Sequence, residues 1–267
     1  LAQDTVGILS QNMPQWTLTD LACLQIRAIP VPIYTTNTAE QALYVMNHAE
    51  VKVLFVGDEK QYHKALEVAS QCPTLQMIVV CDNEVPLTEK QYSIHWNDFL
   101  ALGNSPQYDT ELDKRIAERN LDDLFTIIYT SGTTGEPKGV MLTYENLAFQ
   151  MVGHTERLST VDNTDTSLAF LPLSHVFERA WTYFCLYKAI TVYYLDDTNL
   201  VREALAEVRP TLMCAVPRFY EKIFATVHDK ADASSFAKRM LFKLAVKTGR
   251  RVLTLKEQNR KPSFLLK

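Results

Sequence analysis

The segment from Tyr129 to Gly139, Tyr-Thr-Ser-Gly-Thr-Thr-Gly-Glu-Pro-Lys-Gly, concentrates the side chains that are best suited to holding phosphate groups. Its glycines allow positive φ angles and let backbone N–H groups approach an anion closely. Four hydroxyl side chains add short donors, and Lys138 supplies one compact positive charge. These residue types predict a polyphosphate-binding loop. A plain Ser/Thr/Gly-rich surface loop is the alternative that composition alone leaves open.

The residues before the loop indicate where it lies in the fold. The apolar run from Leu124 to Tyr129 has the β-branched and aromatic content of a buried strand. Open α/β sheets bind ligands at loops that leave the carboxyl ends of strands. A Walker A loop is excluded because Pro137 precedes Lys138 and Gly139 follows it, and the Rossmann glycine pattern is absent.

The loop resembles the signature loop of the adenylate-forming (AMP-binding) superfamily, which includes acyl-CoA synthetases, luciferases and the adenylation domains of peptide synthetases. The resemblance implies that Lys138 is catalytic and that Thr130 is a Mg²⁺ ligand. Glu136 is expected to face solvent, because a carboxylate beside phosphates is unfavourable. The residues assigned to ATP on this ground are Tyr129, Thr130, Ser131, Gly132, Thr133, Thr134, Gly135, Lys138 and Val176.

A second motif, Leu-Pro-Leu-Ser-His-Val-Phe-Glu-Arg over Leu171 to Arg179, lies where a strand turns into an aromatic-rich helix, with Ser174 expected as the N-cap. A single histidine near a helix start is more often structural than catalytic. However, the segment is similar to the second core motif of acyl-activating enzymes, especially long-chain fatty acyl-CoA synthetases, which implies a catalytic role for His175. Some bacterial relatives carry a gating tryptophan at the position of Arg179, so that role is not carried over to Arg179. The residues that the resemblance places in the substrate pocket here are His175, Phe177, Glu178 and Arg179.

A third motif, Val-Pro-Arg-Phe-Tyr-Glu-Lys-Ile over Val216 to Ile223, resembles a segment typical of the long-chain synthetases and implies that Arg218 and Tyr220 belong to the substrate pocket. Taken alone, this segment predicts a helix that begins at a proline. The run from Val6 to Tyr34 resembles the same branch. The resemblance implies that a long-chain fatty acid is activated with ATP and Mg²⁺ to an acyl-adenylate and then joined to CoA, releasing AMP and pyrophosphate. An acyl-adenylating enzyme with another acceptor and a non-catalytic nucleotide-binding remnant remain as alternatives.

Strand-like and helical segments alternate along the chain, which predicts an α/β fold with mostly parallel sheets sandwiched by helices. Asn12 is expected to cap the first helix. The resemblance implies part of the large N-terminal domain of the adenylate-forming fold, with a first α/β subdomain over residues 1–105 and a second over residues 106–267 that holds the loop and the pocket. The expected strands are 6–9, 29–34, 51–56, 77–81, 124–129, 140–142, 167–171, 191–195 and 211–216, and the expected helices are 12–27, 39–48, 60–70, 111–119 and 144–157.

The amino-acid composition limits the classes of protein to which this chain can belong. Of the 267 residues, 47% are hydrophobic, which is ample for a core, while the net charge of -4 argues against a nucleic-acid partner. The five cysteines form no Cys-x-x-Cys pair, which argues against a disulfide framework or zinc site and favours the cytoplasm. The chain does not begin with Met and has no Tyr-Gly-x-Thr-Glu or Thr-Gly-Asp segment, so it is expected to be an N-terminal fragment without the small C-terminal domain, inactive alone.

Residues 233–256 are unusual because they contain seven basic side chains and no acidic one. Leu241, Leu244, Val252 and Leu255 fall on one stripe of a helix. A basic amphipathic helix can lie on an anionic membrane, which predicts peripheral contact with the cytoplasmic face of a membrane. Packing of the stripe in a core, with a solvated basic face, is the alternative. The sequence specifies no oligomeric state.

Overall fold

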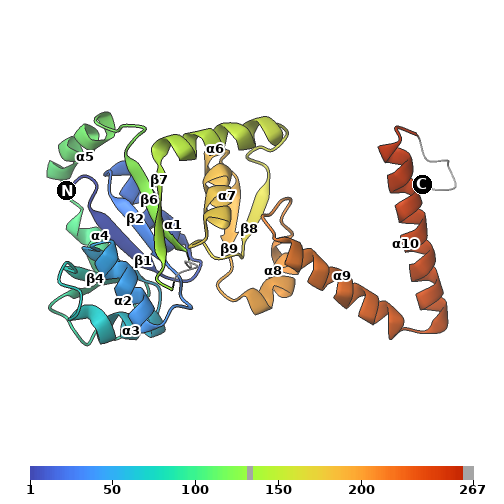
Figure 1. Ribbon diagram of the computed structural model, residues 1–267, viewed down its shortest axis with the longest axis horizontal. Coiled ribbons are helices and arrows are strands. Elements are labelled where there is room, and N and C mark those ends of the chain that lie inside the picture. Colours follow the sequence, from blue (N-terminus) through green and yellow to red (C-terminus); the bar gives the residue numbers. More distant parts are fainter. Residues whose placement is uncertain (131–134, 261–267) are drawn as a thin grey trace. The chain divides into compact units, whose positions relative to one another are not determined.

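The computed structural model describes residues 1–130 and 135–260, which fall into two compact units, 1–214 and 215–267. Within the described residues, the strands belong to the first unit and the second unit is helical (Figure 1). The subdomain boundary expected between residues 105 and 106 stays a prediction.

A parallel sheet forms the first half of unit 1, with the strand order β2-β1-β3-β4-β5. Its strands alternate with helices, as the sequence pattern predicts. Within residues 82–123, β5 and α4 are short elements that the polar, interrupted sequence did not reveal. The elements are β1 (Thr5–Leu9), α1 (Pro14–Gln25), β2 (Ile29–Ile33), α2 (Ala39–His48), β3 (Val53–Val56), α3 (Glu59–Ala69), β4 (Met77–Val80), β5 (Ser93–His95), α4 (Trp96–Leu102) and α5 (Gln107–Ala117).

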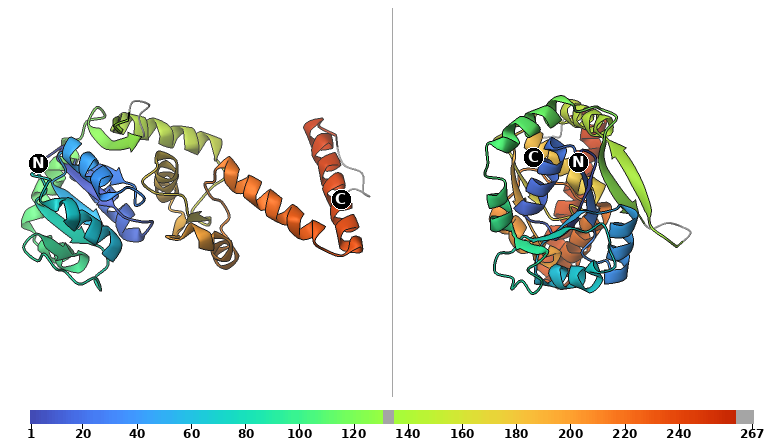
Figure 2. Two further views of the ribbon diagram at one scale, coloured as in Figure 1. Left: turned by 60° about the horizontal axis from the view of Figure 1, so that its bottom comes forward. Right: turned by 90° about the vertical axis from the view of Figure 1, so that its left-hand side faces the viewer.

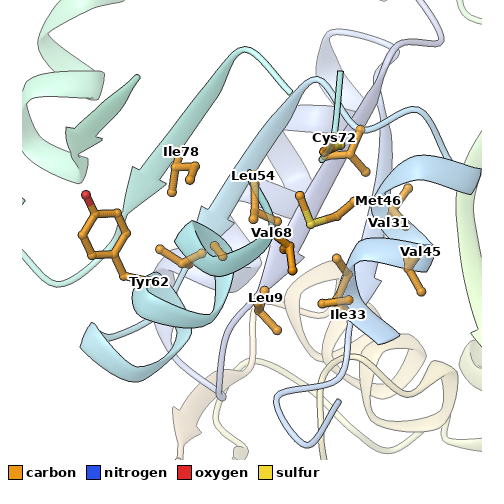
Figure 3. Close-up of a cluster of buried hydrophobic side chains, with 14 of the residues drawn as sticks. Leu9, Val31, Ile33, Val45, Met46, Leu54, Tyr62, Val68, Cys72 and Ile78 are labelled. Carbon is orange, nitrogen blue, oxygen red and sulfur yellow. The ribbon is translucent and has the colours of Figure 1, made fainter. Parts of the chain in front are cut away.

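Side chains on both faces of this sheet are buried, because successive strand residues point to opposite faces and helices cover each face. On one face Leu9, Leu54 and Ile78 pack with Met46 of α2 and Tyr62 of α3 (Figure 3). On the other face Phe55 and Val79 pack with Trp96 of α4, and Ile8 packs with Trp16 of α1. The sandwiched α/β architecture is therefore confirmed.

Strand β2 forms an edge of the sheet because Pro30 and Pro32 have no N–H to donate. It pairs with β1 on one side only. On its other side, Thr126 Oγ1 donates a hydrogen bond of 2.7 Å to the Pro30 carbonyl. The second half of unit 1 is thus joined to the first by a side chain where a regular ladder cannot form.

The second half of unit 1 holds two small sheets. Strands β6 (Leu124–Thr130) and β7 (Lys138–Thr143) form an antiparallel hairpin, so the predicted phosphate loop connects two paired strands. Helix α6 (Tyr144–Arg157) follows, as predicted. Strands β8 (Thr166–Ala169) and β9 (Thr191–Tyr194) are parallel, with α7 (Val176–Tyr187) between them in sequence. The short helices η1 (Thr198–Leu200) and α8 (Val201–Val208) complete the unit.

The strand predicted over residues 211–216 is wrong. Only an isolated bridge joins Leu212 to Ser167. Arg209 has a φ of 50°, and the Thr211 N–H and Leu212 N–H both donate to the Thr166 carbonyl, at 3.0 and 3.2 Å. The segment therefore meets the start of β8 and does not extend along it.

Unit 2 consists of α9 (Pro217–Asp232) and α10 (Phe236–Glu257). Helix α9 begins at Pro217, as predicted. The rings of His228 and Phe242 lie 5.1 Å apart, so this contact joins the two helices. Figure 2 shows how the chain turns from α9 into α10. Among the described residues, none of the helices combines the length and apolar content needed to span a bilayer.

Candidate functional site

The β6–β7 hairpin carries the two ends of the predicted phosphate loop. Thr130 pairs with Lys138 in the strand register, and both are exposed. Lys138 has no ion-pair partner among the described residues. Gly135 has a φ of 106°, a conformation that favours glycine, and Glu136 is exposed, as predicted. The side chains of Thr130 and Lys138 thus leave the same face of the hairpin, next to each other.

Four of the residues assigned to ATP, Ser131, Gly132, Thr133 and Thr134, lie outside the described residues, and their assignment stays a prediction. Thr130 is described, as the last residue of β6, but its assignment as a magnesium ligand also stays a prediction. Within the part of the chain that the structure describes, no three His, Cys, Asp or Glu side chains form a metal-binding group.

Gly139 is required by close packing in the hairpin. A Cβ atom at this position would lie 2.8 Å from Ile127 Cγ2 and 3.3 Å from Tyr129 Cζ. A larger residue would therefore push these two side chains away. The last glycine of the motif keeps the strand register that sets Thr130 opposite Lys138.

Helix α2 holds the end of the hairpin that carries the loop. Tyr129 Oη and His48 Nδ1 lie 2.7 Å apart, and Tyr44 Oη donates to the Pro137 carbonyl at 3.2 Å. The rings of Tyr44 and His48 are stacked, and each meets the Tyr129 ring edge-on. Burial raises the pKa of Tyr129 to about 12. Sequence reasoning missed Tyr44 and His48, although an aromatic pair spaced i, i+4 on a helix is a usable signal.

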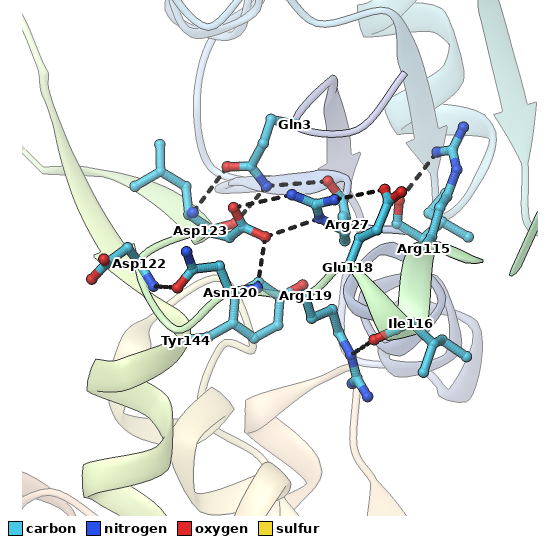
Figure 4. A network of polar contacts seen from close by, with 12 residues as sticks. Gln3, Arg27, Arg115, Ile116, Glu118, Arg119, Asn120, Asp122, Asp123 and Tyr144 are labelled. Carbon is cyan, nitrogen blue, oxygen red and sulfur yellow. Dashed lines mark hydrogen bonds and ion pairs between the residues drawn. The ribbon is translucent and has the colours of Figure 1, made fainter. Parts of the chain in front are cut away.

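The opposite end of the hairpin is anchored by polar contacts (Figure 4). The Gln3 side chain forms two hydrogen bonds with the backbone of Leu124. The Leu124 N–H donates to Gln3 Oε1 at 2.9 Å, and Gln3 Nε2 donates to the Leu124 carbonyl at 3.3 Å. Arg27 donates twice to the Asp123 carboxylate, at 2.9 and 3.3 Å. The hairpin is therefore fixed at one end by α2 and at the other by residues that lie just before β1 and just after α1.

The second motif forms a turn followed by α7. The predicted cap is wrong: Ser174 is buried, and His175 is the N-cap, since its Nδ1 accepts from the Phe177 N–H at 3.2 Å. His175 is exposed, and Val176 and Phe177 are 44% and 49% exposed, so these three side chains can meet a ligand. Their assignments to catalysis, ATP and the substrate pocket stay predictions.

Asn12 does not cap α1, contrary to the expectation from sequence. Met13 is the N-cap residue and makes no side-chain cap bond. The Asn12 side chain instead donates to the carbonyls of Ala169 and Leu171, at 3.2 and 2.8 Å, and accepts from the Leu173 N–H at 2.9 Å. An amide has both donors and acceptors, so it can satisfy all three backbone groups of the turn.

Arg179 is 2% exposed and its guanidinium is held by side chains from two other elements. It donates to both carboxylate oxygens of Asp20, at 2.8 and 2.5 Å, and to Thr126 Oγ1 at 2.7 Å. Tyr183 Oη also donates to Asp20, at 2.6 Å. The guanidinium lies over the Phe125 ring, 4.8 Å from its centre. Arg179 thus joins α7, α1 and β6, while its assignment to the substrate pocket stays a prediction.

Glu178 is fully buried next to the same turn. Its Oε2 accepts from the Leu171 N–H at 3.2 Å, and Oε1 has no hydrogen-bond partner among the described residues. Burial raises the pKa of this carboxyl to about 8, against the smaller opposing effect of the Leu171 N–H. Glu178 is therefore mostly protonated at neutral pH.

Arg218 and Tyr220 belong to α9 of the second unit, and both are exposed. Their expected place in the substrate pocket stays a prediction.

Comparison with known proteins places this arrangement in a family. The family model described as AMP-binding enzyme matches residues 2–257. Long chain acyl-CoA synthetase 3 of Arabidopsis thaliana is 33% identical over 91% of this chain and 37% of its own length. The long-chain-fatty-acid-CoA ligase ACSBG2 of Xenopus laevis is 34% identical over 88% of this chain and 33% of its own length. The chain thus spans about a third of the length of these relatives.

A solved structure shares the fold. A long-chain-fatty-acid-CoA ligase of Archaeoglobus fulgidus superimposes with a TM-score of 0.62 at 19% identity, over 88% of this chain and 43% of that one. The adenylate-forming fold implied by the sequence motifs is confirmed. Because the family model covers nearly the whole chain, from the first strand to α10, the chain belongs to the AMP-binding enzyme family.

Proposed function

We propose that the protein containing this chain activates a long-chain fatty acid with ATP to an acyl-adenylate and then transfers the acyl group to CoA, releasing AMP and pyrophosphate. The observation that carries the proposal is the hairpin, which presents Thr130 and Lys138 opposite each other at the ends of the signature loop. The names of the Arabidopsis and Xenopus relatives support a long-chain fatty acid as the substrate.

The donor set at the hairpin fits a polyphosphate. Lys138 is exposed and has no anionic partner among the described residues, and the only acidic side chain of the loop, Glu136, is exposed beside it. Lys138 and the backbone N–H groups of the loop would stabilise the negative charge that develops on the leaving pyrophosphate. Thr130 is the hydroxyl that would help to hold Mg²⁺, which neutralises phosphate charge when bound.

The exposed residues after the buried turn suit an acyl substrate. Val176 and Phe177 offer apolar surface beside the polar ring of His175. In the proposed reaction, these side chains orient the fatty-acid carboxylate for in-line attack on the α-phosphorus. Positioning of this kind supplies a large part of the acceleration in such a step.

The complete protein should be assayed for two activities with palmitate. Palmitate-dependent exchange of pyrophosphate into ATP together with formation of palmitoyl-CoA would support the proposal. Exchange without thioester formation would point to another acyl acceptor. ATP binding without exchange would point to a non-catalytic nucleotide-binding protein. The fragment alone is proposed to be inactive, and the same two assays test this.

We further propose that the protein works in the cytoplasm, in peripheral contact with a membrane through α10. All five cysteines are free and buried, which suits a reducing compartment. On α10, Leu241 and Leu244 are 68% and 61% exposed. The face that meets α9 carries Phe242 and is therefore distinct from the Leu241–Leu244 stripe. Val252 and Leu255, which belong to the same stripe, are half-buried. Exposed leucines flanked by basic residues match the requirements of a helix that lies in a membrane interface.

A further inference from the structure

We propose that Asn12, which directly precedes the N-cap of α1, and Asp20 within α1 are positioning residues. They hold the two site segments, the 169–177 segment and the β6–β7 hairpin, in register with each other. The inference rests on the proposed function for its catalytic consequence, but its structural part can be tested independently.

Asn12 lies at the edge of the first sheet where ligand sites of such sheets form. The strand order β2-β1-β3 reverses direction at β1, and the crevice outside the carboxyl ends of strands at such a point is the usual ligand site. Asn12 follows β1 at this edge. Its three hydrogen bonds, to Ala169, Leu171 and Leu173, place the turn of the second motif there. Leu173 also packs against Ile8 of β1.

The Asn12 amide meets a requirement that the turn cannot meet by itself. The carbonyl of Leu171 and the N–H of Leu173 lie between β8 and α7, where no regular ladder or helix pairs them. The Ala169 carbonyl, at the end of β8, also accepts from the Leu195 N–H at 3.0 Å. Leu173 is 1% exposed, so water does not readily replace a lost partner. Removal of the amide therefore leaves the turn free to shift, and His175 two residues later shifts with it.

Asp20 supports the hairpin, as Asn12 supports the turn of the second motif. Its carboxylate binds Arg179 of α7, and the same guanidinium donates to Thr126 in the middle of β6. Asp20 is 1% exposed and Thr126 is fully buried, so this chain of bonds is shielded from water. The hairpin, α7 and α1 are thus joined through one guanidinium.

Two further contacts show that α1 is the shared support. Tyr194 of β9 donates to Thr17 Oγ1 at 3.0 Å, and Tyr144 at the start of α6 donates to the Leu24 carbonyl at 2.9 Å. Each of these bonds joins residues far apart in the sequence. A shift of about 1 Å in such a support can lower a reaction rate by about 100-fold, because the reacting groups lose alignment.

The structural part is tested by hydrogen exchange on the complete protein and its variants. In Asn12→Ala, peptides covering residues 169–177 should exchange at least tenfold faster, and in Asp20→Asn those covering α7 and β6 should do so. Thr5→Val is the matched control, because it removes a partly buried side-chain bond of the same sheet, from Thr5 Oγ1 to the Glu50 carbonyl, that touches neither site segment. If hydrogen exchange over residues 169–177 is no faster in Asn12→Ala than in Thr5→Val, the inference is overturned.

The catalytic part is tested by kinetics of palmitate-dependent pyrophosphate exchange. Asn12→Ala and Asp20→Asn should lower kcat by about 10- to 100-fold, because the reacting groups lose alignment. In Asn12→Ala the KM for ATP should change less than about threefold, because the hydrogen bonds of Asn12 involve neither Lys138 nor the hairpin. A purely structural role would leave kcat near that of Thr5→Val at temperatures where all variants are folded, and that result would overturn the positioning role. Absence of exchange in the wild-type protein would refute the proposed function instead, and hydrogen exchange would still decide the inference. Asp20→Asn preserves the shape of the side chain and serves if Asn12→Ala does not fold.

Discussion

Single residues of this chain divide into exposed groups that can meet a ligand and buried groups that hold the site together. Lys138 and His175 are exposed, whereas Glu178 and Arg179, from the same motif as His175, are buried. Sequence motifs identify all four, but they do not separate the two roles. The separation depends on Asp20 and Thr126, which are distant in sequence and become partners of Arg179 only in the fold.

Lys138→Ala is expected to weaken pyrophosphate exchange in the complete protein. One charged hydrogen bond to phosphate contributes about 1 to 3 kcal/mol, which corresponds to a loss of about 5- to 150-fold in kcat/KM for ATP. The exchange assay measures this directly. Lys90→Ala is the control, because Lys90 is an exposed lysine outside both site segments. Equal rates for the two variants would contradict the assignment of Lys138.

Glu178→Gln is expected to stabilise the fold at alkaline pH. The Glu178 pKa rises from 4.5 to about 8 on folding, so the folded state binds this proton more tightly than the unfolded state. The contribution of Glu178 to stability is therefore complete below pH 4.5 and is lost as the pH rises to about 8. Urea unfolding at pH 8 should show Glu178→Gln on the order of 2 to 4 kcal/mol more stable than the wild-type protein, with a smaller difference at pH 5.

Glu84→Gln provides the comparison for that experiment, since Glu84 is exposed. Its free energy of unfolding should follow the wild-type value at both pH values. A Glu178→Gln curve that also stays parallel to the wild-type curve from pH 5 to 8 would show that Glu178 titrates normally.

At the scale of elements, periodicity and turn residues predicted most helices and strands within one or two residues. Helices 39–48 and 144–157 are found at the predicted bounds. The errors have physical causes. Ser174 and Asn12 are residue types that favour the N-cap position, but tertiary structure places both elsewhere. Ser174 is buried, and the Asn12 side chain forms a hydrogen bond with the backbone of Leu173, which is distant in sequence. The antiparallel pairing of β6 with β7 was not predicted, because a glycine-rich loop after a strand is compatible with either a hairpin or a crossover.

Gly139→Ala should disturb the hairpin. The added Cβ would lie 2.8 Å from Ile127 Cγ2, so the packing between the strands must shift. Overpacking of this size costs about 1 to 3 kcal/mol of unfolding free energy. Gly153→Ala, in the middle of α6 with no atom within 4 Å of the new Cβ, is the control and should stabilise by about 0.5 to 1 kcal/mol. Urea unfolding of both variants measures the contrast, and a neutral Gly139→Ala would argue against the observed β6–β7 register.

Helix α10 should lose membrane affinity when its basic side chains are neutralised. Lys243, Lys247, Arg250 and Arg251 replaced by Gln should lower binding of the complete protein to vesicles containing phosphatidylserine at least tenfold, since each basic residue near such a surface contributes about 1 kcal/mol. Co-sedimentation measures the bound fraction. The control replaces four exposed basic residues of unit 1, Lys60, Lys90, Arg157 and Arg202, and so changes the net charge equally. If both variants bind as the wild-type protein does, α10 is not a membrane anchor.

At the scale of the whole molecule, the fold class was readable from the alternation of strands and helices, but the joint between the two halves of unit 1 was not. That joint consists of single side chains, among them Gln3, Asn12, Asp20 and Arg27, which reach partners more than ninety residues away in sequence. No local pattern encodes such pairs. The candidate site therefore has motifs that can be recognised in the sequence and a support that becomes visible only in the structure.

The five cysteines report on the integrity of unit 1 as a whole, because all of them lie in it and all are buried. Burial raises the pKa values of Cys81, Cys185 and Cys214 to about 12. At pH 8 the reactive thiolate is then about 0.01% of each thiol, against about 10% for an ordinary thiol of pKa 9. A disulfide reagent added to the native protein should therefore modify these cysteines at least a hundredfold more slowly than in concentrated guanidinium chloride, where all five should react. Rapid modification of any one of them in the native protein would show that its part of unit 1 opens, and mass spectrometry of the labelled peptides would identify which.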